Sequence, residues 1–165
     1  MRPDIYKVNQ LGLGFLAVMA KPVAGEWIAD EFRGIAQFGI NRLVSLLETH
    51  EIRDLGLQTA PDLCAQNQVE FVHFPIKDRG LPSSFSATQK LVTQLHDDVV
   101  NGSNTVIHCR AGIGRTGLLA AAVLIRHGLD AEAALAMISK ARGVIVPDTE
   151  EQIGWLKKYQ AALRA

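Results

Sequence analysis

Residues 105–126 read TVIHCRAGIGRTGLLAAAVLIR and carry the clearest structural pattern in the chain. Its first four residues, 105–108, form a short apolar run of the kind found in buried strands. Residues 115–127 are apolar on nearly every side, which predicts a helix buried all round. A strand that passes through a glycine-containing loop into a buried helix is a building unit of α/β proteins.

On either side of this stretch, the apolar periodicity and the positions of Gly and Pro predict further strands and helices in alternation. The predicted strands are 14–20, 42–47, 69–74 and 105–108. The predicted helices are 26–38, a stretch with Ile52, Leu55, Leu63 and Cys64 that breaks near Pro61, 85–100, 115–127, 131–141 and 150–162. The alternation predicts an α/β three-layer sandwich: a central, mainly parallel sheet of four to five strands flanked by helices. A single domain over residues 1–165 is expected.

Composition narrows the class of protein. The 165 residues carry 17 basic and 17 acidic side chains, so the net charge is zero and gives no general attraction to nucleic acid or an anionic membrane. Two cysteines are too few for a disulfide framework, which favours a reducing, cytoplasmic setting. The histidines show no ligand spacing, so we expect no metal. We also expect no cofactor and a monomer.

One N-terminal segment needs a choice between two interpretations. Residues 11–20, LGLGFLAVMA, could pass for the apolar part of a signal peptide. Two glycines interrupt it and Asp4 dilutes the charge in front, so a core strand is favoured. No apolar run reaches the roughly 18 residues that a spanning helix needs.

The loop after the strand at 105–108 carries the candidate chemistry. In parallel sheets, ligands bind beyond the carboxyl ends of the strands. A tight loop offers backbone N–H groups to a phosphate dianion, and Gly112 and Gly114 are expected to allow the positive φ values and the close approach that such a loop requires. The helix beginning near Arg115 points its positive end at the same place, and that guanidinium can hold two oxygens. The predicted phosphate-binding residues are Arg110, Ala111, Gly112, Ile113, Gly114 and Arg115.

Cys109 is the predicted nucleophile. A helix N-terminus and neighbouring cations favour a thiolate, which can attack phosphorus directly. Thr116 is placed to hydrogen-bond the sulfur and ease its departure, and His108 is expected to orient the loop through its ring. A phosphate ester also needs an acid for the leaving oxygen. Asp78, in a Gly- and Pro-containing loop after the strand at 69–74, is the candidate.

The sequence HCRAGIGRTG resembles the signature of the protein tyrosine phosphatase superfamily, in particular its compact dual-specificity branch. Residues 74–82 look like the general-acid loop of kinase-associated phosphatases. The resemblance implies Cys109 as nucleophile, Arg115 as phosphate clamp, Asp78 as acid and then base, and Thr116 as the hydroxyl that assists the thiolate. It also implies a phosphorylated protein or peptide as substrate, with phosphate, sulfate or vanadate as anions for the loop.

Five positions depart from, or refine, that resemblance. Residues 148–152 resemble the family's glutamine-containing loop, with Asp148 in place of the first glutamine and Gln152 matching the second, where it could position water. Thr149 could instead cap the last helix. Arg110 is similar to the basic residue of tensin-type and cell-division-cycle phosphatases, whereas Ile113 replaces the second basic residue of the tensin type.

The sequence allows several functions. The favoured one is hydrolysis of phosphotyrosine, with phosphoserine or phosphothreonine as further substrates. The alternatives are a phosphatase for a non-protein ester (RNA 5′-phosphate, inositol phosphate or phosphoinositide), a phospho-binding module without turnover, and sulfur transfer of the rhodanese type. No nucleic-acid or membrane partner is expected.

Overall fold

The computed structural model describes residues 2–165. Its strands are β1 (Ile5–Leu11), β2 (Gly14–Met19), β3 (Arg42–Ser45), β4 (Glu70–His73) and β5 (Thr105–His108). Its helices are α1 (Ile28–Gln37), α2 (Thr49–Asp54), α3 (Ala60–Gln66), α4 (Phe85–Val100), α5 (Gly114–Arg126), α6 (Ala131–Arg142) and α7 (Glu150–Leu163).

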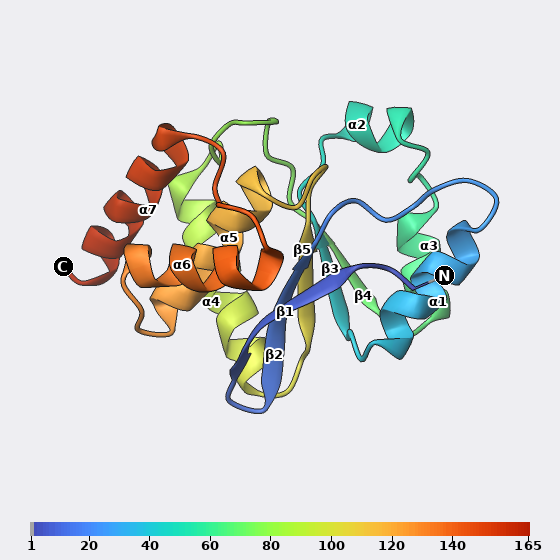
Figure 1. Cartoon of the computed structure of the whole chain (residues 1–165), viewed down its shortest axis with the longest axis horizontal. Helices are drawn as coiled ribbons and strands as arrows, with labels where there is room; N and C mark the ends of the chain where they lie inside the picture. Colours follow the sequence, from blue (N-terminus) through green and yellow to red (C-terminus); the bar gives the residue numbers. More distant parts are fainter. Residues whose placement is uncertain (1) are drawn as a thin grey trace.

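The strands form one five-stranded sheet in the order β1-β2-β5-β3-β4. All neighbouring pairs from β2 to β4 are parallel, and only β1 runs antiparallel, against β2. Figure 1 shows helices on both sides of this sheet, with α2 above the carboxyl ends of the parallel strands. The predicted three-layer α/β sandwich is therefore confirmed, with β5 at the centre of the sheet.

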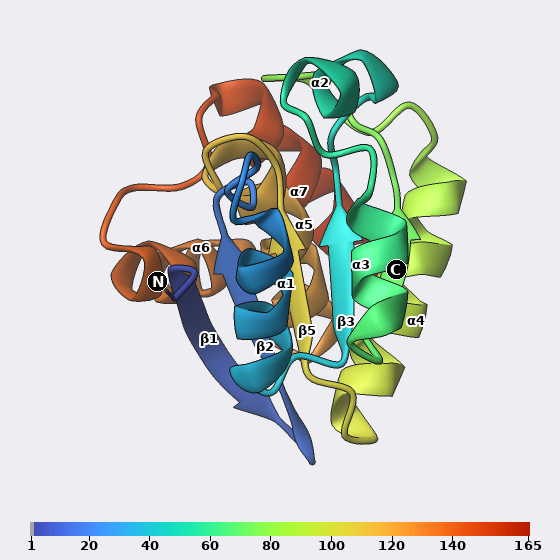
Figure 2. The same cartoon turned by 90° about the vertical axis from the view of Figure 1, so that its right-hand side faces the viewer.

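Each face of the sheet has its own apolar core. Side chains alternate along β5, so that Val106 packs with α1 and α3 while Ile107 packs with the α4–α7 layer. Figure 2 shows α1 and α3 on the near face. On the far face, α5 is buried at every position from Gly114 to Ile125, as its apolar sequence predicts. The helix that follows the candidate catalytic loop thus lies in the main core.

The sequence did not predict β1. Its residues IYKVNQL are only partly apolar, and most of its side chains are half-buried or exposed. The strand forms because it pairs antiparallel with β2 across the short turn at Gly12, which has φ 65°. Within the segment at 11–20, Gly14–Met19 form a core strand, as favoured, whereas Leu11 ends β1 and residues 12–13 form the turn.

Two helix predictions need correction. The break in the second predicted helix lies at residues 55–59, and Pro61 stands in the first turn of α3, where its missing N–H costs nothing. The first helix begins at Ile28, so Trp27 precedes it and is 61% exposed instead of packing on the buried face. Phe38, just after that helix, is also exposed.

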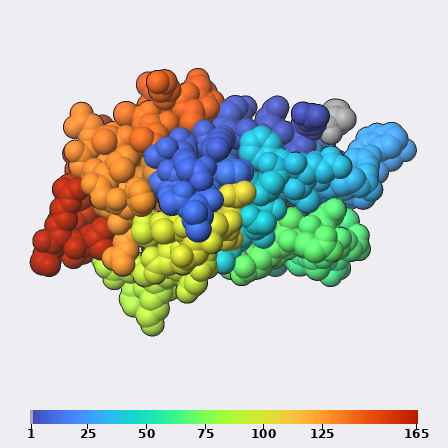
Figure 3. All heavy atoms as spheres, turned by 90° about the horizontal axis from the view of Figure 1, so that it is seen from below, coloured from blue at the N-terminus to red at the C-terminus, as the bar shows by residue number. Residues whose placement is uncertain are grey.

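Figure 3, seen from below, shows the end of the molecule opposite α2, where the β1–β2 turn in blue lies beside the α4–β5 connection in yellow. Leu13 donates its backbone N–H to the Val100 carbonyl oxygen at 2.9 Å. A Cβ on Gly12 would stand 2.7 Å from that same oxygen. The turn therefore needs glycine both for its backbone conformation and for this close approach.

Gly12→Ala should destabilise the protein more than Gly56→Ala. Both glycines have left-handed φ values, 65° and 70°, which cost an alanine about 1–2 kcal/mol. At Gly56 the new Cβ would meet only the Ala24 side chain at 3.6 Å, an ordinary contact. At Gly12 the overlap with Val100 should add about 1–3 kcal/mol. Urea unfolding of both variants measures the difference. Equal losses in the free energy of unfolding would show that the turn can shift away from Val100 without cost.

Candidate active site

The loop between β5 and α5, residues 109–113, lies against the end of β2. Gly112 has φ 74°, as predicted, and a Cβ there would stand 2.5 Å from the Met19 carbonyl oxygen. Lys21 donates its backbone N–H to the Arg110 carbonyl oxygen at 3.0 Å. These contacts hold the loop close to its neighbouring strand.

The predicted positive φ at Gly114 is wrong. Gly114 is the first residue of α5 and lies against the exposed side chain of Asp148, whose carboxylate a Cβ on Gly114 would displace. The approach brings Asp148 from the α6–α7 connection to the start of the catalytic helix. The sequence showed Asp148 as a departure from a glutamine and as the one other carboxylate whose loop could reach the pocket, but it did not indicate the contact with Gly114.

Cys109 follows the last residue of β5 and is 3% exposed, with a free thiol. The ring of His108 donates from Nδ1 to the Cys109 carbonyl oxygen at 3.0 Å. Burial, followed by the charges of Arg115 and His73, lowers the pKa of His108 to about 4 despite this hydrogen bond. The imidazole is therefore neutral near pH 7, with the proton on Nδ1 and a lone pair on Nε2.

Arg115 is 1% exposed, and a carboxylate from α2 holds its guanidinium at both ends. Nη1 donates to Glu51 Oε1 at 2.7 Å, and Nη2 donates to Glu51 Oε2 at 3.0 Å. Nη1 also donates to the Ile76 carbonyl oxygen at 2.9 Å. Arg115, the candidate clamp, is thus fixed by α2 and by the start of the loop that carries Asp78.

Glu51 and Arg115 stabilise each other's charged form. Burial acts to raise the pKa of Glu51, but hydrogen bonds from Arg115 and from the Glu48 backbone, with the Arg115 charge, lower it to about 2. Burial acts to lower the pKa of Arg115, and Glu51, Cys109 and Asp78 together raise it above its ordinary value. Both partners stay ionised at neutral pH.

Asp78 reaches the same guanidinium. Its Oδ1 lies 3.2 Å from Arg115 Nη2, and its side chain is 58% exposed. Gly80 donates its N–H to the Lys77 carbonyl oxygen at 2.8 Å, which closes a turn with Arg79 in the left-handed region at φ 58°. The candidate acid therefore stands at the tip of a tight turn, open to solvent beside the clamp.

The hydroxyl of Thr116 makes no hydrogen bond within residues 2–165, although it is completely buried. The expected hydrogen bond to the Cys109 sulfur is absent from the structure. The third residue of α5 thus leaves one unpaired hydroxyl among the described residues.

Gln152 is buried, and its amide is engaged with the backbone. Oε1 accepts from the N–H groups of Asp148 and Thr149, at 3.1 and 3.2 Å, while Nε2 donates to the Gly80 carbonyl oxygen at 3.2 Å. Thr149 caps α7 by accepting from the Gln152 N–H. These contacts support a role for Gln152 in joining the acid loop to α7, whereas its predicted water-positioning role stays a prediction.

The loop's outer residues have partners that the sequence did not identify. Arg110 is half exposed, and its Nε lies 3.4 Å from Glu51 Oε2. Arg142, in the last turn of α6, donates to the Ala111 carbonyl oxygen at 2.9 Å while its guanidinium lies 4.5 Å from the centre of the Tyr6 ring. Ile113 is partly buried against the main core.

Sequence reasoning therefore missed Glu51 and Arg142. For Glu51 a signal existed: it follows β3, a parallel strand that ends at the same edge of the sheet as β5. For Arg142 there was none, since a basic residue in the last turn of a helix is ordinary. Within residues 2–165 no three His, Cys, Asp or Glu side chains gather as metal ligands, and no helix is both long and apolar enough to cross a membrane.

Comparison with known proteins agrees with this geometry. Residues 17–129 match the family model described as "Polymorphic toxin system, DSP-PTPase phosphatase". The chain belongs to this family of phosphatases, which is of the dual-specificity, protein-tyrosine-phosphatase type.

Curated relatives carry phosphatase or kinase-inhibitor names. The chain is 30% identical over 84 residues to a putative tyrosine phosphatase of Invertebrate iridescent virus 6, covering 50% of this chain and 59% of the relative. It is 30% identical over 129 residues to human cyclin-dependent kinase inhibitor 3, covering 77% and 60%. The chain thus spans less than two thirds of these relatives.

Solved structures share the whole fold. The structure of kinase-associated phosphatase, with its catalytic cysteine replaced by serine, aligns with a TM-score of 0.87 at 22% identity, covering 100% of this chain and 98% of that one. The active form of Tk-PTP aligns with a TM-score of 0.79 at 26% identity, covering 98% and 99%.

Glu51→Gln should lower the free energy of unfolding at neutral pH by about 3–5 kcal/mol, because it removes the charge that pairs with a buried guanidinium. The pKa of Glu51 falls from 4.5 to about 2 on folding, so its contribution is complete above pH 4.5 and is lost as the pH falls through about 2. Urea unfolding between pH 7 and pH 2 should therefore show the gap between parent and variant closing on acidification.

Glu26→Gln is the control, since Glu26 is exposed. The free energy of unfolding of Glu26→Gln should equal that of the parent at every pH. A Glu51→Gln gap that stayed constant down to pH 2 would mean that the carboxylate contributes by packing and not by charge.

Proposed function

We propose that this protein hydrolyses phosphotyrosine in proteins or peptides, and phosphoserine or phosphothreonine as further substrates, through a phosphocysteine on Cys109. The observation that carries the proposal is the convergence on one point of a cysteine loop at a helix N-terminus, the Arg115 clamp and the Asp78 carboxyl. A phosphate dianion in the loop would receive backbone N–H groups and the Arg115 guanidinium.

The chemistry would run in two displacements. In the first, the Cys109 thiolate attacks phosphorus, an S–P bond forms and the P–O bond to the tyrosyl oxygen breaks, with Asp78 giving its proton to that oxygen. In the second, water attacks phosphorus and the Asp78 carboxylate takes a proton from it. The S–P bond then breaks, inorganic phosphate leaves and the thiolate is restored.

A protein substrate is favoured over a phosphoinositide or other non-protein ester. Part of the charge of Arg110 is directed to Glu51, and Ile113 packs on the core, so the loop offers few free cations to a multiply phosphorylated ring. The relatives' names point both ways: one plant relative is both a phosphatidylinositol 3,4,5-trisphosphate 3-phosphatase and a protein tyrosine phosphatase. The two free cysteines favour action in the cytoplasm, and we propose a monomer.

Substrate trapping tests the proposal. Asp78→Ala should retain phosphotyrosine peptides on an immobilised protein, and vanadate should release them, because the clamp persists while turnover is lost. Asp62→Ala, on the exposed surface of α3, is the matched control and should trap nothing. Retention of inositol phosphates but not of phosphopeptides would move the assignment to the non-protein esters.

Asp78→Asn should lower kcat by about 10²–10⁴-fold on a phosphotyrosine peptide, with little change in affinity. The loss should be smaller on nitrophenyl phosphate, because its leaving group needs little protonation. The descending limb of the pH–rate profile should disappear as well. Equal losses on both substrates, with the bell-shaped profile kept, would assign Asp78 a structural role and make Asp148 the next carboxylate to test.

Peroxide should oxidise Cys109 and leave Cys64 untouched. Burial raises the pKa of Cys64 to about 12, so its thiol stays protonated, whereas a nucleophilic thiolate is the first species to oxidise. Peptide mass mapping should find the modified Cys109, and phosphate should protect it.

Cys109→Ser should abolish turnover; residual activity above about one hundredth would contradict a covalent intermediate.

A further inference from the structure

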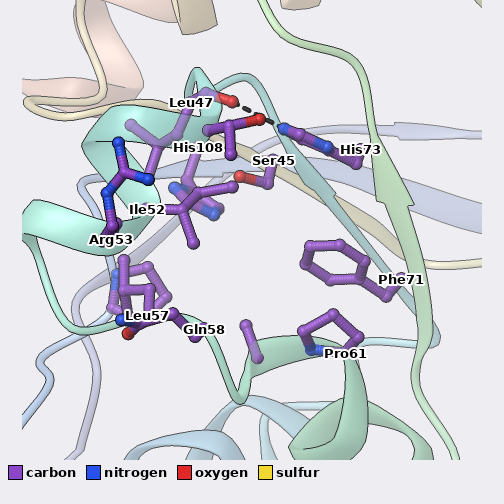
Figure 4. Close-up of a pocket in the computed structure, with 13 residues that line it drawn as sticks. Ser45, Leu47, Ile52, Arg53, Leu57, Gln58, Pro61, Phe71, His73 and His108 are labelled. Atoms are coloured by element: carbon purple, nitrogen blue, oxygen red, sulfur yellow. Dashed lines mark hydrogen bonds between the residues drawn. The ribbon is translucent and has the colours of Figure 1, made fainter.

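A cavity of about 430 Å³ opens on the face of the sheet covered by α1 and α3, beneath α2. Ser45 and His108, both 2% exposed, come from the carboxyl ends of β3 and β5 and line its innermost part. Figure 4 shows Ile52 and Leu57 on one side of the open space and Phe71 and Pro61 on the other. No residue from 109 to 115 lines it, so the cavity is separate from the phosphate loop.

The polar groups deep in this cavity are neutral, and one has an unused acceptor. His108 donates from Nδ1 to the Cys109 carbonyl oxygen, which leaves its Nε2 as a lone-pair acceptor. Ser45 adds a hydroxyl beside it. The only lining side chain with a permanent charge is Arg53, which lies on α2 and is exposed. The interior therefore suits an uncharged group that donates one hydrogen bond.

The walls suit a flat apolar body. Leu47 and Leu57 are buried, Ile52 and Phe71 are half-buried, and all four border the cavity. The volume falls in the range of about 300–1,000 Å³ that is typical of small-molecule sites, which combine such walls with a few placed polar groups. An aromatic ring can fill this space while its edge carries the donor.

The cavity contacts the catalytic residues from two directions. On α2, Glu51 holds Arg115 while the next two residues, Ile52 and Arg53, line the cavity. In β5, the His108 ring that borders the cavity also holds the carbonyl group of Cys109. A molecule in the cavity would thus touch the neighbour of the clamp's carboxylate and the ring that orients the nucleophile's peptide.

We propose that this cavity is an effector site for a small, neutral aromatic molecule whose hydroxyl donates to His108 Nε2, and that its occupancy changes turnover at Cys109. The coupling rests on the phosphatase activity proposed above, whereas the binding does not. Coupling energies between sites commonly correspond to changes of about 5–150-fold. We expect saturation of the cavity to change kcat/KM at least about fivefold.

2-Naphthol is the probe, and 2-methoxynaphthalene, which lacks the donor, is its matched partner. Ligand-observed NMR with the full chain should detect 2-naphthol binding, more weakly for the methyl ether, and saturating vanadate should not displace it. Gln58→Trp, at the exposed mouth, should abolish binding. Gln66→Trp makes the same change on exposed α3 outside the cavity, and it should bind like the parent.

Each other outcome counts against the proposal. Absence of binding at millimolar 2-naphthol, or binding that survives Gln58→Trp, would overturn the site. Displacement by vanadate would place the aromatic ring in the catalytic loop instead. Equal binding of the methyl ether would overturn the hydrogen bond to His108. Binding without a change in phosphate release from a phosphotyrosine peptide would overturn the coupling, provided that the peptide is hydrolysed; if it is not, the proposed function fails while the binding result stands.

Discussion

The Arg115–Glu51 ion pair is the interaction on which the candidate site depends. A guanidinium that is 1% exposed must have a carboxylate and further acceptors, because an unpaired buried charge is strongly unfavourable. Glu51 supplies the carboxylate from α2, and Ile76 supplies a carbonyl oxygen from the acid loop. One side chain therefore holds together three segments that lie far apart in the sequence.

The geometry of the sheet makes that convergence inevitable. The parallel strands β3, β4 and β5 all end at the same edge, so the segments that follow them meet there. The segment after β3 brings Glu51, the one after β4 brings Asp78, and the one after β5 brings Cys109 and Arg115. Gln152 then ties the acid loop to α7 through the Gly80 carbonyl oxygen.

The sequence predicted the features that lie within one continuous stretch and missed those that depend on contacts between distant residues. The strand, loop and helix around Cys109 could be recognised because their pattern lies within one continuous stretch. Arg142 could not be recognised, since it looks like an ordinary helix residue until the fold brings it to the loop. Glu51 was overlooked, although it follows a parallel strand that ends at the same edge of the sheet as β5. The contact between Gly114 and the carboxylate of Asp148, 34 residues further along the chain, is likewise made by the fold. The strand β1 was missed because pairing with β2, and not its own hydrophobicity, stabilises it.

The complete burial of α5 has a consequence for how such an enzyme can diversify. The same helix presents its first turn to the candidate phosphate loop and packs the remainder into the main core. Substitutions along it would alter folding and reactivity together, so selection has little freedom to adjust one without the other. New specificities are therefore expected to arise in the connections at the carboxyl edge, around residues 21–27, 48–59, 77–84 and 143–149, while α5 itself stays nearly constant.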